Sequence, residues 1–180
     1  MRHTIAVWVR NQHGVLARVS NLFAARGYNI DSLVVGVTEN PKLSRMTIVV
    51  KGEDRVIDQV DKQLNKLVDV IRVEDLTPTD FIARDLALIK VKVDNATRSH
   101  VMEIAQCFDA KIVDVALKSF IIEVTGKESK VNALVDLLRP YGLVEMVRTG
   151  EVAIFRGKRV EEAVETHVKV KRGRPGQENL

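Results

Sequence analysis

Residues 4–38, TIAVWVRNQHGVLARVSNLFAARGYNIDSLVVGVT, decide the fold, because they join a strand pattern to a helix pattern and then to a second strand. Residues 4–10 are rich in the β-branched and aromatic side chains that favour strands. Residues 15–26 place apolar side chains at helical spacing along one stripe, and Gly27 stands where a helix commonly ends. Residues 29–38 return to a strand pattern. The stretch predicts a strand, a helix and a second strand in succession.

The same alternation continues outward from this stretch. Residues 44–51 alternate as a strand, residues 53–67 form an amphipathic helix pattern, and residues 68–75 close the unit as a strand. A connector at Thr77–Asp80 follows, in which Pro78 disfavours both helix and sheet ladder. The second half repeats the order βαββαβ more loosely, with elements expected at 85–93, 97–108, 111–116, 119–125, 128–138 and 143–155, the last split near Gly150.

We therefore predict an α+β fold made of two tandem ferredoxin-like βαββαβ domains. The first domain is expected over residues 1–77 and the second over residues 78–157. Residues 158–180 are polar and charged, and we expect them to form a flexible tail.

Composition narrows the class of protein. Hydrophobic residues make up 46% of the chain but aromatic residues only 4%, so the core is expected to be aliphatic. The single cysteine, Cys107, excludes a disulfide within the chain and favours a reducing compartment; its place on the apolar side of a predicted helix suggests a core position.

The apolar run at Ile5–Val9 is too short for a signal peptide, and no apolar stretch reaches 18 residues. We expect a soluble, cytoplasmic protein without a membrane partner.

The net charge of +4 is concentrated at one end of the chain. Residues 156–180 carry seven basic and four acidic side chains, a net charge of +3, which leaves +1 for the other 155 residues. A basic nucleic-acid-binding face is therefore not the organising feature of the domains. The tail contains RGRP at Arg172–Pro175, a string similar to the core of an AT-hook, but one short copy fits a solvated basic tail better.

The segment NQHGVLARV, Asn11–Val19, carries the chemistry that singles out a ligand site. Gly14 stands at the predicted helix start, where backbone N–H groups lack partners and, with the helix dipole, suit a carboxylate. The amides of Asn11 and of Asn29, which opens the next strand, are expected to converge there and to accept from an ammonium group. Val15, Leu16 and Ile30 would supply an apolar wall for a branched aliphatic side chain. An ordinary turn with a capping asparagine remains the alternative.

Other functions find little support in the residues. The four histidines, at positions 3, 13, 100 and 167, show no metal-binding spacing, and no glycine-rich phosphate loop occurs. The order βαββαβ is shared with RNA-recognition motifs, and Trp8 lies on the first strand, but residues 44–51 lack the aromatic signature of those domains. We expect neither a catalytic site nor a metal site in this chain.

Several strings resemble the N-terminal ACT domain of the acetohydroxyacid synthase (acetolactate synthase) small regulatory subunits. These strings are N-x-x-G-V-L-A-R-V at Asn11–Val19, R-G-Y-N-I-D-S-L at Arg26–Leu33, L-S-R-M-T-I at Leu43–Ile48 and K-Q-L-N-K-L-V-D-V-I-R-V at Lys62–Val73. The resemblance continues at lower specificity to about residue 157, as in I-V-D-V at Ile112–Val115, and it leaves the basic tail unexplained.

The resemblance implies a non-catalytic subunit of branched-chain amino acid biosynthesis. It implies that the chain activates a separate catalytic subunit, which uses thiamine diphosphate, Mg²⁺ and FAD, and that this chain holds none of them. It also implies a homodimer of side-by-side ACT domains with valine, a feedback inhibitor, bound at the interface. By the same resemblance, Asn11, Gly14 and Asn29 match the valine-site motif, and the backbone around Val15 and Leu16 should lie against the ligand. The alternative is a stand-alone amino-acid-sensing ACT regulator whose basic tail contacts DNA.

Overall fold

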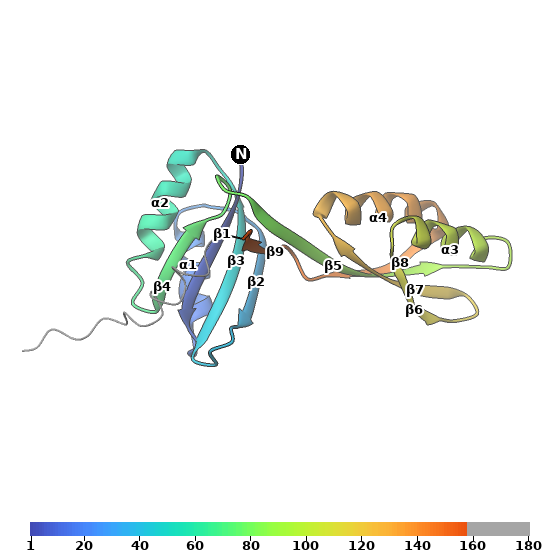
Figure 1. Ribbon diagram of the computed structural model, residues 1–180, viewed down its shortest axis with the longest axis horizontal. Coiled ribbons are helices and arrows are strands. Elements are labelled where there is room, and N and C mark those ends of the chain that lie inside the picture. The colour runs from blue at the N-terminus through green and yellow to red at the C-terminus, as the bar shows by residue number, and fades with distance from the viewer. Residues whose placement is uncertain (158–180) are drawn as a thin grey trace, which may run out of the picture.

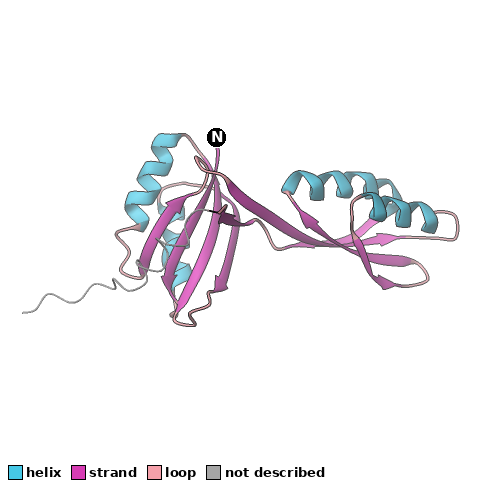
Figure 2. Ribbon diagram, in the orientation of Figure 1, coloured by secondary structure: helices cyan, strands magenta, loops and turns pink. Residues whose placement is uncertain are grey.

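The computed structural model describes residues 1–157, which form two lobes, each a sheet covered on one face by two helices (Figures 1 and 2). The first lobe has strand order β2-β3-β1-β4, with β3 and β4 both antiparallel to β1. Its elements are β1 (Arg2–Arg10), α1 (Val15–Ala25), β2 (Ile30–Val37), β3 (Leu43–Lys51), α2 (Asp54–Leu64) and β4 (Val70–Asp75).

The second lobe repeats this architecture, with strand order β6-β7-β5-β8. Its elements are β5 (Phe81–Lys92), α3 (Arg98–Cys107), β6 (Lys111–Val115), β7 (Ser119–Gly126), α4 (Glu128–Gly142) and β8 (Leu143–Arg148), followed by β9 (Val152–Phe155). Each strand in this order occupies the place of its counterpart in the first lobe. The expected α+β fold with two tandem βαββαβ units is therefore confirmed.

Each lobe has its own aliphatic core between sheet and helices. In the first, Val7 and Ile48 of the sheet pack with Phe23 of α1 and Val60 of α2. In the second, Ile89, Ile122 and Leu134 belong to an equivalent cluster. Cys107 is exposed at the end of α3, so the expectation that it belongs to the core is wrong; Ala105 and Phe108 on either side of it turn toward the core, which leaves Cys107 on the outer side of the helix.

A two-stranded ribbon joins the lobes. Phe81–Arg84 at the start of β5 pair with β9, while the rest of β5 pairs with β7 and β8 of the second sheet. This ribbon lies on the face of the first sheet opposite its helices, where Ala6, Leu76 and Ala153 form a small buried cluster (Figure 1). Both ends of the expected second domain therefore pack against the first.

Two elements are longer than the sequence pattern indicates. β5 begins at Phe81, four residues early, because its first residues pair with β9 rather than with the second sheet. α4 runs through Pro140 to Gly142; the proline has no N–H to donate to the preceding turn, and the helix ends two residues after it. No helix within residues 1–157 is long and apolar enough to cross a membrane.

Candidate effector site

The loop between β1 and α1 places Gly14 at the helix start in a left-handed conformation. Its φ angle is +77°, a value that non-glycine residues rarely adopt. Gly14 is the N-cap residue of α1, and its carbonyl accepts the first intrahelical bond from the Arg18 N–H at 3.0 Å. The positive φ angle therefore explains why glycine occupies this position. Glycine also leaves the approach to the helix start free of a Cβ.

The first turn of α1 presents its backbone donors without a capping side chain. Among residues 1–157, no side chain forms a cap hydrogen bond at this helix start, and the first turn contains no acidic residue. The N–H groups of a first turn have no intrahelical partner and carry the positive end of the helix dipole. The arrangement suits an anion such as the carboxylate of an amino acid.

Arg18 adds a positive charge beside this helix start, a feature that the sequence reasoning missed. Its Nε and Nη2 lie 2.8 and 2.6 Å from Oδ2 of Asp69, whose side chain is 8% exposed. A Cβ built on Gly14 would lie 3.1 Å from the Arg18 Nη1. The guanidinium is thus fixed by a nearly buried carboxylate and directed at the position where a ligand would approach Gly14.

Asn11 lies at the same end of the sheet, tied to the turn between β2 and β3. Its backbone N–H donates to the Lys42 carbonyl at 2.8 Å, and its Nδ2 donates to the Pro41 carbonyl at 3.0 Å. These two bonds engage the backbone nitrogen and the side-chain nitrogen of the residue and orient the side-chain amide. Its carbonyl oxygen is the atom that an ammonium group would contact.

Asn29 does not converge with Asn11 in one chain, which corrects the expectation from sequence. β3 lies between β1 and β2, and Asn29 precedes the residue paired with Val50, whereas Asn11 follows the residue paired with Leu43. The two asparagines therefore stand at opposite ends of the sheet, roughly 30 Å apart along the strands at about 3.3 Å per residue. The expectation failed because β1 and β2 run the same way: one residue follows its strand and the other precedes its strand.

The expected apolar wall is also only partly available. Val15 is 3% exposed and packs in the core of the lobe, so only its backbone can face a ligand. Ile30 packs against the same core from the far end of the sheet. Leu16 is 45% exposed near Gly14, and the edge strand β2 carries exposed Val35 and Val37 toward the same end. Leu16, Val35 and Val37 thus offer the accessible apolar surface, and only Leu16 was expected.

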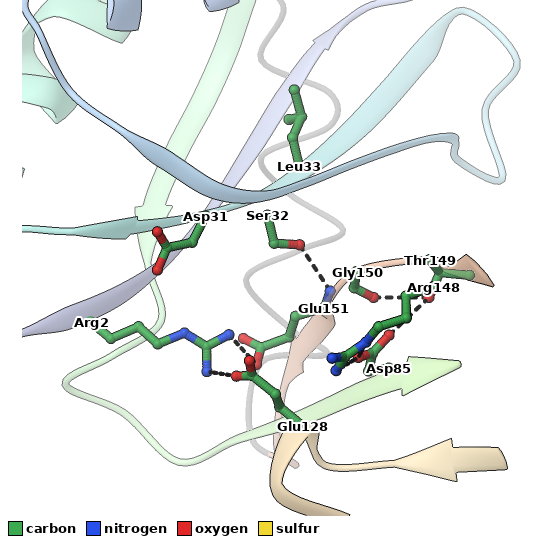
Figure 3. A pocket seen from close by; sticks show the side chains of 10 residues that line it. All are labelled: Arg2, Asp31, Ser32, Leu33, Asp85, Glu128, Arg148, Thr149, Gly150 and Glu151. Carbon is green, nitrogen blue, oxygen red and sulfur yellow. Dashed lines mark hydrogen bonds and ion pairs between the residues drawn. The ribbon is translucent and has the colours of Figure 1, made fainter. Parts of the chain in front are cut away.

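A second feature that the sequence did not indicate is a cavity of about 360 Å³ between the lobes (Figure 3). Its lining is strongly charged, and the charges pair with one another: Arg2 with Glu128 and Glu151, and Arg148 with Asp85. Ser32 of β2 faces it and contacts Glu151 (Figure 3). The cavity is thus a polar junction between β2 and the second lobe.

Trp8 serves the contact between the lobes rather than an open surface. Its ring lies between the guanidinium groups of Arg45 and Arg72, 5.0 and 5.2 Å from the ring centre, and it packs against the ribbon cluster. Arg45 also donates to the Ala153 carbonyl at 2.5 Å, and burial lowers the pKa of its guanidinium. The ring is therefore engaged by these side chains and by the ribbon, which does not suit base stacking.

Within residues 1–157, no group of three or more His, Cys, Asp or Glu side chains is arranged to hold a metal ion. The RGRP string at Arg172–Pro175 lies outside the described residues.

Comparison with known proteins places these features in a family. Residues 84–157 match the profile described as the small subunit of acetolactate synthase, and residues 5–72 match that of the AHAS small subunit-like ACT domain. A probable acetolactate synthase small subunit from Archaeoglobus fulgidus is 54% identical over 159 residues, covering 88% of this chain and 99% of the relative. The chain belongs to the acetolactate synthase small subunit family.

Further members of the family agree over the same length. The acetolactate synthase small subunit of Aquifex aeolicus is 49% identical, with 89% of this chain and 84% of the relative covered. The crystal structure of the acetolactate synthase small subunit from Thermotoga maritima aligns with a TM-score of 0.83 at 42% identity, covering 88% of this chain and 99% of the other. The first lobe is therefore an ACT domain, and the chain is a small subunit of acetolactate synthase, an assembly of branched-chain amino acid biosynthesis with a catalytic large subunit.

Proposed function

We propose that this small subunit is a non-catalytic regulator that activates the catalytic subunit of acetolactate synthase and makes it sensitive to feedback inhibition by valine. The observation that carries the proposal is the helix start at Gly14. Unpartnered donors, a charge at Arg18 and exposed Leu16 meet there on an ACT domain of this family. Together they offer what a small branched amino acid needs: an anion site and an apolar surface.

A side-by-side dimer would complete the site. β2 pairs with β3 on one side only and is an edge strand of its sheet, with Val35 and Val37 exposed. Antiparallel pairing of two β2 strands about a two-fold axis would place the start of one strand beside the end of the other. Asn29 of the partner subunit would then approach the end that carries Asn11 and Gly14. The pairing accounts for both asparagines, although they lie apart in one chain.

The chemistry of acetolactate formation is assigned to the catalytic subunit. Thiamine diphosphate, Mg²⁺ and FAD are expected there, and we propose that this chain binds none of them. Valine would act by binding more tightly to the less active state of the complex, because a ligand with equal affinity for both states shifts nothing. We propose that the complex lies in the cytoplasm, where the substrates of acetolactate formation would be available.

The melting temperature of the purified chain tests the effector site directly. Valine at about 100 times its dissociation constant is expected to stabilise the fold by about 2.7 kcal/mol, a readily measured shift. Leucine and isoleucine should be run beside it, because one methylene changes affinity by only about 1–3 kcal/mol in such a pocket. Alanine and lysine serve as controls. Equal shifts with valine, alanine and lysine, or none with any branched amino acid even beside the catalytic subunit, would contradict the assignment.

A further inference from the structure

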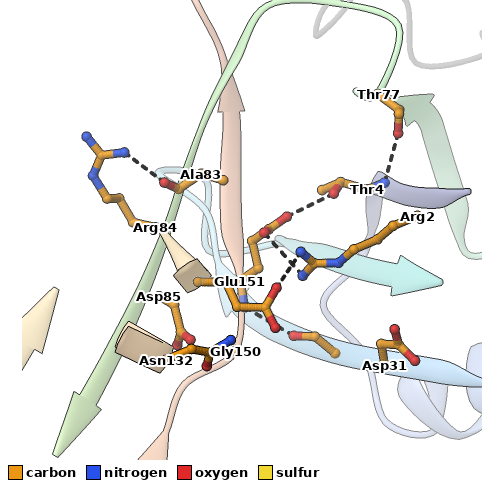
Figure 4. Close-up of polar contacts among 12 residues, drawn as sticks. Arg2, Thr4, Asp31, Thr77, Ala83, Arg84, Asp85, Asn132, Gly150 and Glu151 are labelled. Atoms are coloured by element: carbon orange, nitrogen blue, oxygen red, sulfur yellow. Dashed lines mark hydrogen bonds and ion pairs between the residues drawn. The ribbon is translucent and has the colours of Figure 1, made fainter. Parts of the chain in front are cut away.

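The polar contact between β2 and the second lobe is centred on Glu151, which is 9% exposed (Figure 4). Its carboxylate accepts from the Thr4 hydroxyl at 2.8 Å and from Arg2 Nη2 at 3.3 Å. Its backbone N–H donates to the Ser32 hydroxyl at 3.1 Å. We call this set, Arg2, Thr4, Ser32, Gly150 and Glu151, the junction clamp. It ties β1 and β2 of the ACT domain to the segment between β8 and β9.

Gly150 lets this segment approach β2 closely. Its φ angle is +86°, and a Cβ at this position would lie 2.4 Å from the Ser32 hydroxyl and 3.2 Å from a methyl of Val34. A side chain at this position would therefore force the side chains of Ser32 and Val34 to move, and the positive φ angle disfavours one in any case. The backbone of the second lobe is therefore in direct contact with the edge strand of the ACT domain, so a shift of that strand cannot leave the segment unaffected.

The clamp is also connected to a candidate effector residue. Asn29 donates through Nδ2 to Oδ1 of Asp31 at 3.2 Å, and Asp31 lines the same cavity as Ser32 (Figure 3). Asn29, Asp31 and Ser32, at and just before the start of β2, thus connect the proposed dimer interface to the clamp.

On the other side, the clamp is held by the second lobe itself. Arg2 also pairs with Glu128, in the first turn of α4, at 2.5 Å. Beside Gly150, the Arg148 guanidinium pairs with Asp85 of β5, whose side chain is 4% exposed. These ion pairs fix the two strands that join the lobes, so the segment moves with the second lobe rather than independently of it.

We propose that the junction clamp transmits the effector state of the ACT domain to the second lobe. Ligand binding at the β2 edge would fix the position of Ser32, and through it that of Glu151 and of the second lobe. Loss of the Ser32–Glu151 contact would then uncouple the two lobes without removing the ligand site. This inference rests on the proposed function, since it requires an effector that binds the ACT domain.

Hydrogen exchange of the full chain, with and without excess valine, tests the clamp. We expect valine to slow exchange in residues 11–19 and also in residues 150–155, the latter by about fivefold, at the lower end of usual allosteric couplings. Ser32→Ala removes the acceptor for the Glu151 N–H, whereas Glu151→Gln keeps that backbone bond and removes the charge that pairs with Arg2. Both variants should keep the valine effect in residues 11–19. In residues 150–155, Ser32→Ala should abolish the effect and Glu151→Gln should reduce it. Asp136→Asn, in an exposed pair on α4, is the matched control and should behave as the parent.

Each outcome decides between the two proposals. Valine protection of residues 150–155 that survives both variants, or protection confined to residues 11–19 in the parent, would overturn the role of the clamp while leaving the effector site intact. Absence of valine protection anywhere, also with the catalytic subunit present, would overturn the proposed function and the clamp with it. Should Ser32→Ala lower the melting temperature strongly, Glu151→Gln carries the comparison, since it keeps the backbone bond to Ser32 and changes only the charge of the side chain.

Discussion

Glycine at position 14 serves both the left-handed backbone and the proposed anion site, and a pair of substitutions separates these two roles. Its left-handed backbone disfavours most side chains, but asparagine and aspartate both tolerate that conformation. Gly14→Asp adds a negative charge at the helix start, beside the Arg18 guanidinium, where the effector carboxylate is expected to bind. We expect it to abolish the valine-induced rise in melting temperature.

Gly14→Asn is the control for that substitution, because it has nearly the same shape and no charge. It should keep a valine-induced shift, although a smaller one. An Asp variant that responds to valine as the parent does would show that the anion site lies elsewhere. An equal loss in both variants would assign the effect to bulk and not to charge.

At the level of single residues, the sequence predicted the site in part. Asn11 and Gly14 were placed correctly at one end of the sheet, because a strand that leads directly into a helix leaves little choice of geometry. Asn29 was misplaced because strand order is set by long-range pairing, which periodicity does not report. The side chain of Val15 was offered for the apolar wall although it fills the core, which leaves its backbone for the ligand. Arg18 was overlooked because its partner, Asp69, is 51 residues away.

Among the elements, α3 begins with a capping arrangement that predicts a pH dependence. Asp94 accepts hydrogen bonds from the Thr97 hydroxyl at 2.8 Å and from the backbone N–H groups of Ala96 and Thr97. These bonds lower the pKa of Asp94 below its ordinary value of 3.8. Because the folded state holds the carboxylate charged, its contribution to stability is present above pH 3.8 and is lost as the pH falls through the lowered pKa.

Urea unfolding at a series of pH values checks this dependence. The stability difference between the parent and Asp94→Asn should be largest near neutral pH and should shrink as the pH falls below 3.8. Thr97→Val, which removes the hydroxyl donor, should shift the loss to higher pH. A difference that does not change with pH would mean that the charge of Asp94 has no part in the cap.

The edge strand β2 carries the proposed dimer contact, and a charge on it tests that contact. Val37 is 61% exposed near the end of the strand. Val37→Lys places a charge on an edge that a second copy would cover, and charged edge strands resist pairing. We expect the variant to sediment as a smaller species than the parent at the same concentration. Val68→Lys, at a position 82% exposed and away from β2, should leave the assembly unchanged. Dissociation by both substitutions, or by neither, would count against pairing through β2.

Elements were predicted better than residues, because helix and strand periodicity is a local property. The positions of α1, β3, α2, α3 and β7 follow closely from the apolar pattern. The start of β5 and the end of α4 were missed for different reasons. Phe81–Arg84 become a strand only because β9 pairs with them, and Pro140 concealed a last helical turn that the core around Leu138 supports.

For the whole molecule, Leu76 marks where the ribbon packs onto the ACT domain. It is fully buried at the end of β4, together with Ala6 and Ala153. Leu76→Ala is expected to lower the free energy of unfolding by about 2–5 kcal/mol, as for other buried leucines. Leu117→Ala, at a position 87% exposed, should change it by less than about 0.5 kcal/mol. Denaturant unfolding measures both, and equal effects would show that the ribbon cluster adds no stability.

The sequence predicted two separate domains with a connector. In the structure, the ribbon of β5 and β9 packs on the first lobe and holds the two lobes together. The βαββαβ repeat could be predicted from the sequence because each unit builds its own core. The packing of β9 on the first lobe could not be predicted, since Val152–Phe155 pair with residues about seventy positions earlier. The clamp at Glu151 depends on the same long-range contact, which explains why no local motif indicated it.

The central claim is that this chain regulates a separate catalytic subunit in response to valine. Acetolactate formation by the catalytic subunit, measured alone, with this chain, and with this chain and increasing valine, tests it most directly. We predict that the chain raises the activity and that valine then lowers it, while valine has little effect on the catalytic subunit alone. Activity that does not change on addition of the chain, or that valine lowers equally without it, would contradict the account.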